Sequence, residues 1–216
     1  MDLGAGNGIL SYALSRKGYR VAALEPDPSK TLGRGAIRFL AESSGVDISV
    51  IDGWGESIPE SGASWDGIVA RQVLHHARSL GKMCKEVFRV LKPGGVFFAI
   101  REHVIRSLKD KEIFFQIHPL HRFYGGENAF LLKEYLRAFR EAGFSGIRSW
   151  GFWETPINYA PLSSAELQTK LSRRLPFVPQ RFLREGAAFR RMAAKAMNYL
   201  FFTPGCLYSF MMRKQL

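Results

Sequence analysis

The first eight residues constrain the fold of this chain more than any other stretch. Asp2 closes a short apolar strand, and glycines follow at Gly4, Gly6 and Gly8, directly before a helical pattern. Glycine tolerates the left-handed backbone of a tight turn, and without a Cβ atom it lets a ligand approach the main chain closely. Backbone N–H groups at the start of the next helix favour a phosphate-like or nucleotide-like group. The stretch therefore predicts a strand-turn-helix unit that binds a nucleotide-like ligand.

Apolar periodicity after this motif alternates between strand and helix. Strands alternating with helices predict an α/β fold with a mostly parallel sheet, and 216 residues suffice for one such domain with additions. Expected strands are 1–3, 19–24, 46–51, 65–70, 96–101 and 147–153, and expected helices are 9–17, 29–44, 79–91 and 129–142.

An acidic residue follows the second expected strand. Glu25 stands 21 positions after Gly4, and Pro26 and Pro28 turn the chain away immediately afterwards. Nucleotide-binding α/β folds place a carboxylate at this point, where it accepts hydrogen bonds from ribose hydroxyls. We therefore predict that Glu25 binds a ribose.

Later motifs occur in a recognisable order. Leu74-His75-His76 follows the fourth expected strand, and Leu91-Lys92-Pro93-Gly94-Gly95 precedes the fifth. With the opening glycines, they make residues 1 to about 155 resemble class I S-adenosylmethionine (SAM)-dependent methyltransferases, in the small-molecule branch that includes the ubiquinone and menaquinone enzymes. The resemblance implies a Rossmann-like seven-stranded sheet with helices on both faces, in which Leu207–Met212 is an antiparallel last strand. Because only three residues remain for the first strand, the chain looks N-terminally truncated.

The resemblance also implies SAM as cofactor and assigns its contacts. It places Arg71 and Gln72 by the methionine part and Gly55 and Glu56 by adenine, where Trp54 replaces the usual acid. Trp54 could stack on the ring, or Asp52 could take the acid's part. The full set of expected cofactor-binding residues is Asp2, Gly4, Ala5, Gly6, Gly8, Glu25, Pro26, Gly55, Glu56, Arg71 and Gln72.

The motifs fit dinucleotide dehydrogenases and nucleic-acid methyltransferases less well. A dinucleotide dehydrogenase carries Gly-x-Gly-x-x-Gly, whereas here Gly8 falls one position early and Ile9 takes the expected place. A nucleic-acid amine methyltransferase would carry an Asn-Pro-Pro-Tyr-like motif where Arg71-Gln72-Val73-Leu74 stands. SAM and a small-molecule or lipid-like acceptor, methylated on O, N or C, are therefore favoured over NAD and nucleic acid.

Two polar or basic segments leave carboxyl ends of expected strands, the edge where open α/β sheets bind ligands. We predict that Glu102–Asn128 and Thr155–Thr203 form a substrate lid. The expected domain division is 1–155 for the SAM-binding core, 156–204 for a basic helical lid insertion and 205–216 for the last strand. Within the lid, His103 or His121 is the candidate general base and Glu102 its orienting partner. The alternative is that these side chains only hydrogen-bond to each other. His118 and His121 form His-x-x-His without further ligands at metal spacing, so no metal is expected.

Charge and cysteine content bear on location and partners. From residue 161 onward the sequence contains ten Lys or Arg residues and only two acidic residues. The basic amphipathic stretch 181–200 is either a plain lid helix or a peripheral contact with an anionic membrane. Cys84 and Cys206 form no disulfide pattern, which favours a reducing cytoplasm. A second class of function stays open, an inactive SAM-binding or partner-binding module.

Overall fold

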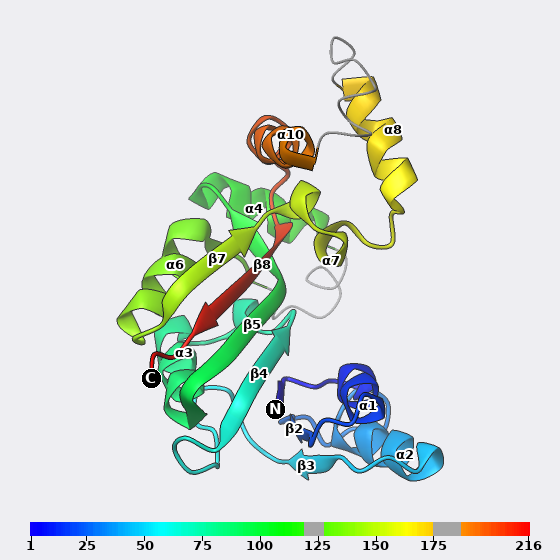
Figure 1. The fold of residues 1–216 in the computed structure, drawn as a ribbon, viewed down its shortest axis with the longest axis vertical. Helices are drawn as coiled ribbons and strands as arrows, with labels where there is room; N and C mark the ends of the chain where they lie inside the picture. Colours follow the sequence, from blue (N-terminus) through cyan, green and yellow to red (C-terminus); the bar gives the residue numbers. More distant parts are fainter. Residues whose placement is uncertain (119–127, 175–186) are drawn as a thin grey trace. The chain divides into compact units, whose positions relative to one another are not determined.

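The computed structural model describes residues 1–118, 128–174 and 187–216 (Figure 1), without the side chains of 174 and 187–191. Its contacts group into two compact units. Unit 1 comprises Met1–Ile100, Leu132–Arg148 and Phe210–Leu216, and unit 2 comprises Arg101–Leu131 and Ser149–Ser209. The expected insertion 156–204 falls in unit 2, together with residues 101–131.

The elements that begin in unit 1 follow the predicted alternation of strand and helix. In chain order they are β1 (Asp2–Leu3), α1 (Ile9–Arg16), β2 (Ala22–Leu24), α2 (Arg34–Ser44), β3 (Ser49–Ile51), β4 (Trp65–Arg71), the 3-10 turn η1 (Leu74–His76), α3 (Leu80–Val90), β5 (Leu91–Ile105), α6 (Leu132–Glu141) and β7 (Ser145–Trp150). The last strand, β8 (Cys206–Arg213), ends in unit 1.

The sheet has the strand order β3-β2-β1-β4-β5-β8-β7. Pairs β1–β2, β2–β3, β1–β4 and β4–β5 are parallel, and Asp2 lies opposite Ala23 and Val69. Gly94 N–H donates to Lys214 O, and Lys214 N–H donates to Gly95 O, each at 3.0 Å. Lys214 thus lies opposite two residues, Gly94 and Gly95, the pairing of a β-bulge between antiparallel strands with a left-handed glycine in first position. The predicted antiparallel last strand next to the sixth expected strand is confirmed (Figure 1).

The core of unit 1 follows from the apolar faces of its helices. Leu80, Met83, Cys84 and Val87 of α3 are buried, as their i, i+3, i+4 spacing predicts. Ser79 precedes this helix, and its side chain accepts a hydrogen bond from Lys82 N–H. A buried cysteine at such a position behaves as a small apolar side chain.

Two of the wrong expected boundaries bear on the candidate site. The second helix begins at Arg34 instead of Ser29, because Ser29 N–H donates to Asp27 Oδ1 at 2.8 Å and Leu32 N–H donates to Ser29 Oγ at 3.2 Å. Such side-chain bonds offer the backbone an alternative to helix. The fifth strand runs on to Ile105, so Glu102 and His103 lie in a strand and not in a loop.

Unit 2 is mostly helical. Besides the end of β5 and the start of β8 it contains α4 (Leu108–Ile117), β6 (Phe130–Leu131), the 3-10 turn η2 (Phe152–Glu154), α7 (Pro156–Tyr159), α8 (Ser164–Arg174) and α10 (Ala187–Leu200). Strand β6 pairs in parallel with the end of β5. The expected helix 129–142 is therefore replaced by β6 followed by α6.

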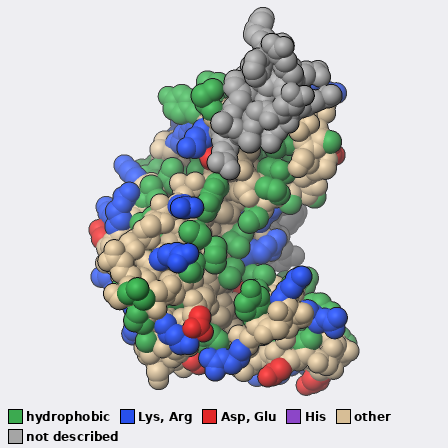
Figure 2. Space-filling view, in the orientation of Figure 1, with side chains coloured by type: hydrophobic (Ala, Val, Ile, Leu, Met, Phe, Trp, Pro, Cys, Tyr) green, Lys and Arg blue, Asp and Glu red, His purple; other side chains and the backbone are tan. Residues whose placement is uncertain are grey.

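The core of unit 2 joins α8 to α10. Leu167 and Leu171 pack with Ala193, Ala194 and Met197 around Trp153 and Tyr159. The excess of positive charge in the sequence is visible at the surface, because Figure 2 shows more Lys and Arg than Asp and Glu side chains on the face that it draws. None of the helices within the described ranges has the length and apolar character needed to cross a bilayer.

Candidate functional site

The glycine loop joins β1 to α1 at the carboxyl edge of the unit 1 sheet. Gly4 and Ala5 both donate their backbone N–H groups to Leu24 O, at 2.9 and 3.1 Å. Gly6 has a φ of 56°, and a Cβ atom there would meet only Leu32 O, at 4.0 Å. A side chain at Gly6 would therefore point into open space, so the loop presents bare backbone there.

Glu25 lies at the tip of β2 and is tied to this loop. Its side chain is 7% exposed. Oε2 accepts a hydrogen bond from Gly6 N–H at 2.7 Å, and Oε1 accepts one from Asp27 N–H at 3.0 Å. A carboxylate offers about four acceptor sites. Each oxygen of Glu25 has thus used one site on a backbone donor and keeps capacity for a second donor such as a ribose hydroxyl.

Arg34 holds the turn after Glu25, and the sequence analysis missed it. Its Nη1 atom donates to Glu25 O at 3.0 Å, Pro26 O at 2.7 Å and Asp52 Oδ1 at 2.6 Å. A glycine stands on either side of Arg34, and a Cβ at Gly35 would lie 2.9 Å from Ser29 O. The Gly-Arg-Gly tripeptide was the available signal, because only glycine allows the start of α2 to pack so closely on this turn.

Asp2 is a buried carboxylate beneath the glycine loop. It is 2% exposed, and its Oδ2 atom accepts a hydrogen bond from Ser11 Oγ of α1 at 2.6 Å. Burial raises the pKa of Asp2 from 3.8 to about 6, although the Ser11 hydrogen bond acts in the opposite direction. This bond links β1 to α1 across the loop.

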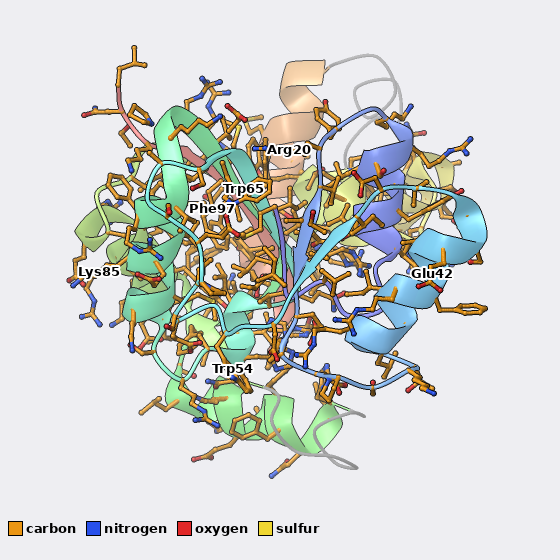
Figure 3. The ribbon with its side chains drawn as sticks, turned by 90° about the horizontal axis from the view of Figure 1, so that it is seen from below. Arg20, Glu42, Trp54, Trp65, Lys85 and Phe97 are labelled. Carbon is orange, nitrogen blue, oxygen red and sulfur yellow. The ribbon has the colours of Figure 1, made fainter. Side chains whose placement is uncertain are left out.

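The loop after β3 carries the residues assigned to adenine. Trp54 is 58% exposed, and the Arg78 guanidinium lies 5.6 Å from its ring centroid. In Figure 3 Trp54 lies well apart from Trp65, the first residue of β4, whose ring contacts the Arg20 guanidinium. Glu56 Oε1 accepts hydrogen bonds from Arg78 N–H at 2.9 Å and Ser79 N–H at 3.4 Å. Glu56 therefore stabilises the N-terminus of α3, a role that the sequence analysis did not foresee.

Three further expected cofactor positions, Gly55, Arg71 and Gln72, also lie in unit 1. A Cβ at Gly55 would lie 2.7 Å from Met83 Cε of α3, so the backbone there is pressed against that helix. Arg71 ends β4 with its side chain exposed. Gln72 follows with a φ of 58° and donates its N–H to Ile100 O at 2.9 Å. A non-glycine residue in this left-handed region costs about 1 kcal/mol or more and is often found at functional sites.

The candidate catalytic residues belong to unit 2. Glu102 is fully buried, and His103 is 8% exposed. His103 Nδ1 lies 2.7 Å from Gly205 O, and the His118 ring centroid lies 5.0 Å from that of His103. A carbonyl can only accept, so Nδ1 carries a proton and Nε2 is the basic nitrogen of the neutral ring. His121 lies outside the described residues, and the base and orienting roles remain predictions.

The unit 1 residues fit SAM on three observations. Gly6 leaves the backbone uncovered, Glu25 retains acceptor capacity beside it, and Asp2 keeps a carboxylate under the same turn. Gly6, Glu25 and Asp2 all lie in or directly after β1 and β2, two adjacent parallel strands. The carboxyl ends of such strands are where α/β folds bind ligands. Within the described ranges, no group of three or more His, Cys, Asp or Glu side chains is placed to hold a metal ion.

Comparison with known proteins agrees with this geometry. Residues 1–99 match the family model described as a methyltransferase domain. A ubiquinone biosynthesis O-methyltransferase of Methylobacterium sp. (strain 4-46) is 32% identical over 99 residues, which are 46% of this chain and 39% of that protein. The chain thus matches well under half the length of this curated relative.

Solved structures extend the likeness to the whole chain at the level of fold. The phosphoethanolamine N-methyltransferase 2 of Haemonchus contortus, solved with S-adenosylhomocysteine, covers 99% of this chain and 48% of its own, with a TM-score of 0.62 and 14% identity. The [4+2]-cyclase SpnF covers 100% of this chain and 73% of its own, with a TM-score of 0.63 and 19% identity. Residues 1–99 of this chain are thus similar to the methyltransferase domain family, and the whole chain shares with these solved structures a Rossmann-like, mostly parallel α/β fold with an antiparallel last strand.

Proposed function

We propose that this protein is a SAM-dependent methyltransferase that acts on a small-molecule or lipid-like acceptor. The observation that carries the proposal is the hydrogen bond from Gly6 N–H to the Glu25 carboxylate. This bond places the glycine loop next to the proposed ribose-binding carboxylate, so that the two can form one site. The family match over the same residues supports it.

The chain's own residues have separable tasks in this proposal. Glu25 and Pro26 bind the ribose, Asp2 and the glycine loop hold the methionine end, and Arg34 fixes the Glu25 turn. The bound sulfonium would supply an electrophilic methyl group. The protein then mainly has to align the acceptor's nucleophile with that methyl, a task worth several kcal/mol of barrier in well-oriented systems.

For acceptors that must lose a proton, His103 is the proposed base. Gly205 O fixes the imidazole through Nδ1, so Nε2 is the atom that takes the proton. Glu102 and His121 stay candidates for orienting or replacing it. Because the curated relatives are named O-methyltransferases of ubiquinone biosynthesis, a hydroxylated aromatic is the first acceptor class to test.

Calorimetric titration with S-adenosylhomocysteine tests the cofactor site. Wild type should bind, and Glu25→Gln should bind about tenfold or more weakly, because a charge-assisted acceptor is lost. Glu42→Gln is the matched control, since Glu42 is an exposed glutamate on α2 of the same unit. Absence of heat from folded wild-type protein would refute the cofactor site. Unchanged affinity in folded Glu25→Gln would refute the ribose assignment alone.

The second candidate is a protein that binds SAM without transferring its methyl group. The cyclase among the structural neighbours favours keeping this reading, because its name attaches another reaction to the same fold. Incubation with methyl-labelled SAM and a panel of hydroxylated aromatics separates the two. Label transferred to an acceptor supports the enzyme, whereas tight cofactor binding without transfer to any acceptor supports the binding module.

Peripheral membrane contact and a cytoplasmic location are proposed on sequence grounds only. Ten basic residues from position 161 onward support attraction to anionic lipid. Co-sedimentation with phosphatidylglycerol vesicles, compared with phosphatidylcholine vesicles, tests this contact. Equal binding to both would contradict an electrostatic origin.

A further inference from the structure

Unit 2 contains a pocket that no part of the proposed cofactor site uses. Its volume is about 550 Å³, within the range of about 300–1,000 Å³ typical of small-molecule sites. The wall consists of η2, one face of α8, the end of α10 and the chain leading into β8, all within unit 2. Helices α8, α10 and strand β8 can be followed in Figure 1.

Aromatic and apolar side chains make up most of the pocket wall. Phe152, Trp153, Phe201, Phe202 and Leu207 line it. Trp153 also belongs to the core cluster that joins α8 to α10, so the wall is anchored by packing. The Arg106 guanidinium carbon lies 4.1 Å from the Phe202 ring centroid, a cation–π contact that stabilises this ring. The wall therefore suits a flat or linear apolar body.

The uncharged polar side chain at the end of α10 is already satisfied by the protein. Asn198 Nδ2 donates to Glu154 Oε2 at 2.8 Å, and Asn198 Oδ1 accepts from Trp153 N–H at 3.1 Å. Glu154 Oε2 also accepts from Gly151 N–H at 2.8 Å. Asn198 thus serves to hold η2 against α10, and both polar atoms of its amide have partners at this end of the pocket.

Both charged residues in the described part of the lining are cations. Lys170 and Arg173 lie three positions apart on α8, and none of the described lining residues is an acid. Neither of them forms an ion pair with a carboxylate among the described residues. The nearest acid on α8, Glu166, has its carboxylate held by Ser163 N–H and Ser163 Oγ. Residues at i and i+3 share one helix face, so the two cations can act on one group.

From this combination we propose that the pocket binds an amphipathic anion, with an apolar chain or ring against the aromatic wall and a carboxylate or phosphate head at Lys170 and Arg173. An apolar body is attracted by burial, and the anionic head is attracted by two cations on one helix face, neither of which forms an ion pair within the described part of the chain. This inference does not depend on methyl transfer.

The direct test is titration of the whole chain with dodecanoate below its micellar concentration, followed by calorimetry. Saturable one-to-one binding is expected. The Lys170→Gln/Arg173→Gln double variant should weaken it about tenfold or more, because two charge-assisted bonds are lost. Lys195→Gln, an exposed lysine on α10 outside the lining, is the control and should change affinity less than about twofold.

Two matched probes distinguish specific from diffuse binding. Dodecanol has the same chain without charge, so its weaker binding should be the same in wild type and in the double variant. Dodecyl phosphate should behave as dodecanoate does. Equal weakening by Lys195→Gln and by the double variant would show diffuse electrostatics and overturn the proposal. Binding to phosphatidylglycerol vesicles without binding of the monomeric probes would also overturn it, in favour of a membrane surface.

Fluorescence locates the ligand. Trp153 is the tryptophan that lines the pocket, and bromine quenches an indole only on close approach. Bromododecanoate should quench part of the wild-type emission, and Trp153→Phe should remove that quenching while the calorimetric affinity persists. Quenching that survives Trp153→Phe would place the ligand elsewhere and refute the site. Because this readout requires no cofactor, its failure is distinguishable from failure of the proposed methyltransferase activity.

Discussion

Replacing Asp2 by asparagine should stabilise the protein at neutral pH. The Asp2 side chain is almost fully buried, and its described hydrogen-bond partner is Ser11, through Oγ at 2.6 Å and through the backbone N–H. Its pKa is about 6 in the folded protein against 3.8 for an unperturbed aspartate, with burial as the largest cause. Asparagine has a similar shape and can still accept from Ser11, but it carries no charge that must be buried.

The sign and size follow from proton linkage. Because the folded pKa lies above the unfolded one, the folded state binds more protons between pH 4 and 6, and stability falls as pH rises through that window. A shift of about two pKa units corresponds to about 3 kcal/mol, at about 1.4 kcal/mol per unit. The advantage of Asp2→Asn in free energy of unfolding should therefore grow by about 3 kcal/mol from pH 4 to pH 7 and then stay constant.

Urea unfolding of both proteins at several pH values, followed by circular dichroism, measures this difference. Groups common to both proteins largely cancel in the comparison. Asp47→Asn, an exposed aspartate of the same unit, is the control and should show no such growth. An advantage of Asp2→Asn that is independent of pH would refute the burial argument. The same variant should bind S-adenosylhomocysteine more weakly if the carboxylate contributes to the methionine end of the site.

Three further outcomes follow from the described contacts. Gly6→Ala and Gly45→Ala both place alanine at a φ near 60°, so each should cost about 1 kcal/mol in unfolding, but only Gly6→Ala should weaken cofactor binding in calorimetry. Arg34→Lys should lower stability by about 1–2 kcal/mol and weaken the same binding, because lysine cannot reproduce the bonds of the guanidinium, whereas exposed Arg38→Lys should do neither. Burial raises the pKa of Cys206 to about 12, so a thiol reagent at pH 7 should modify this residue only after denaturant is added.

The cofactor half of the fold was predictable because its signals are local. The glycine spacing, Glu25 at the end of β2 and the apolar face of α3 each depend on residues within one turn or one strand. Periodicity reports which face of an element is buried, and the sheet order then follows from the alternation of strand and helix. These features needed no knowledge of distant contacts.

Other features depend on contacts between residues far apart in sequence. Arg34 acts on Asp52, and Glu56 acts on the backbone of Arg78 and Ser79, so neither role is visible in a local pattern. The continuation of β5 to Ile105 is supported by the pairing of its end with β6. In contrast, the helix after β5 carries a capping box of Ser107 and Asp110, a local signal that was present and overlooked.

The family match covers only the first part of the chain, so it carries no information on ligand recognition by the rest. The match ends at residue 99, and the first segment of unit 1 ends at Ile100. Similarity to the named O-methyltransferases therefore concerns the part of the chain that holds the proposed cofactor site, whereas unit 2 lies outside it. A fold that also supports a cyclase does not determine the reaction. Ligand recognition by unit 2 has to be tested separately from cofactor binding, and there the aromatic pocket with Lys170 and Arg173 favours an amphipathic anion over a polar or cationic ligand.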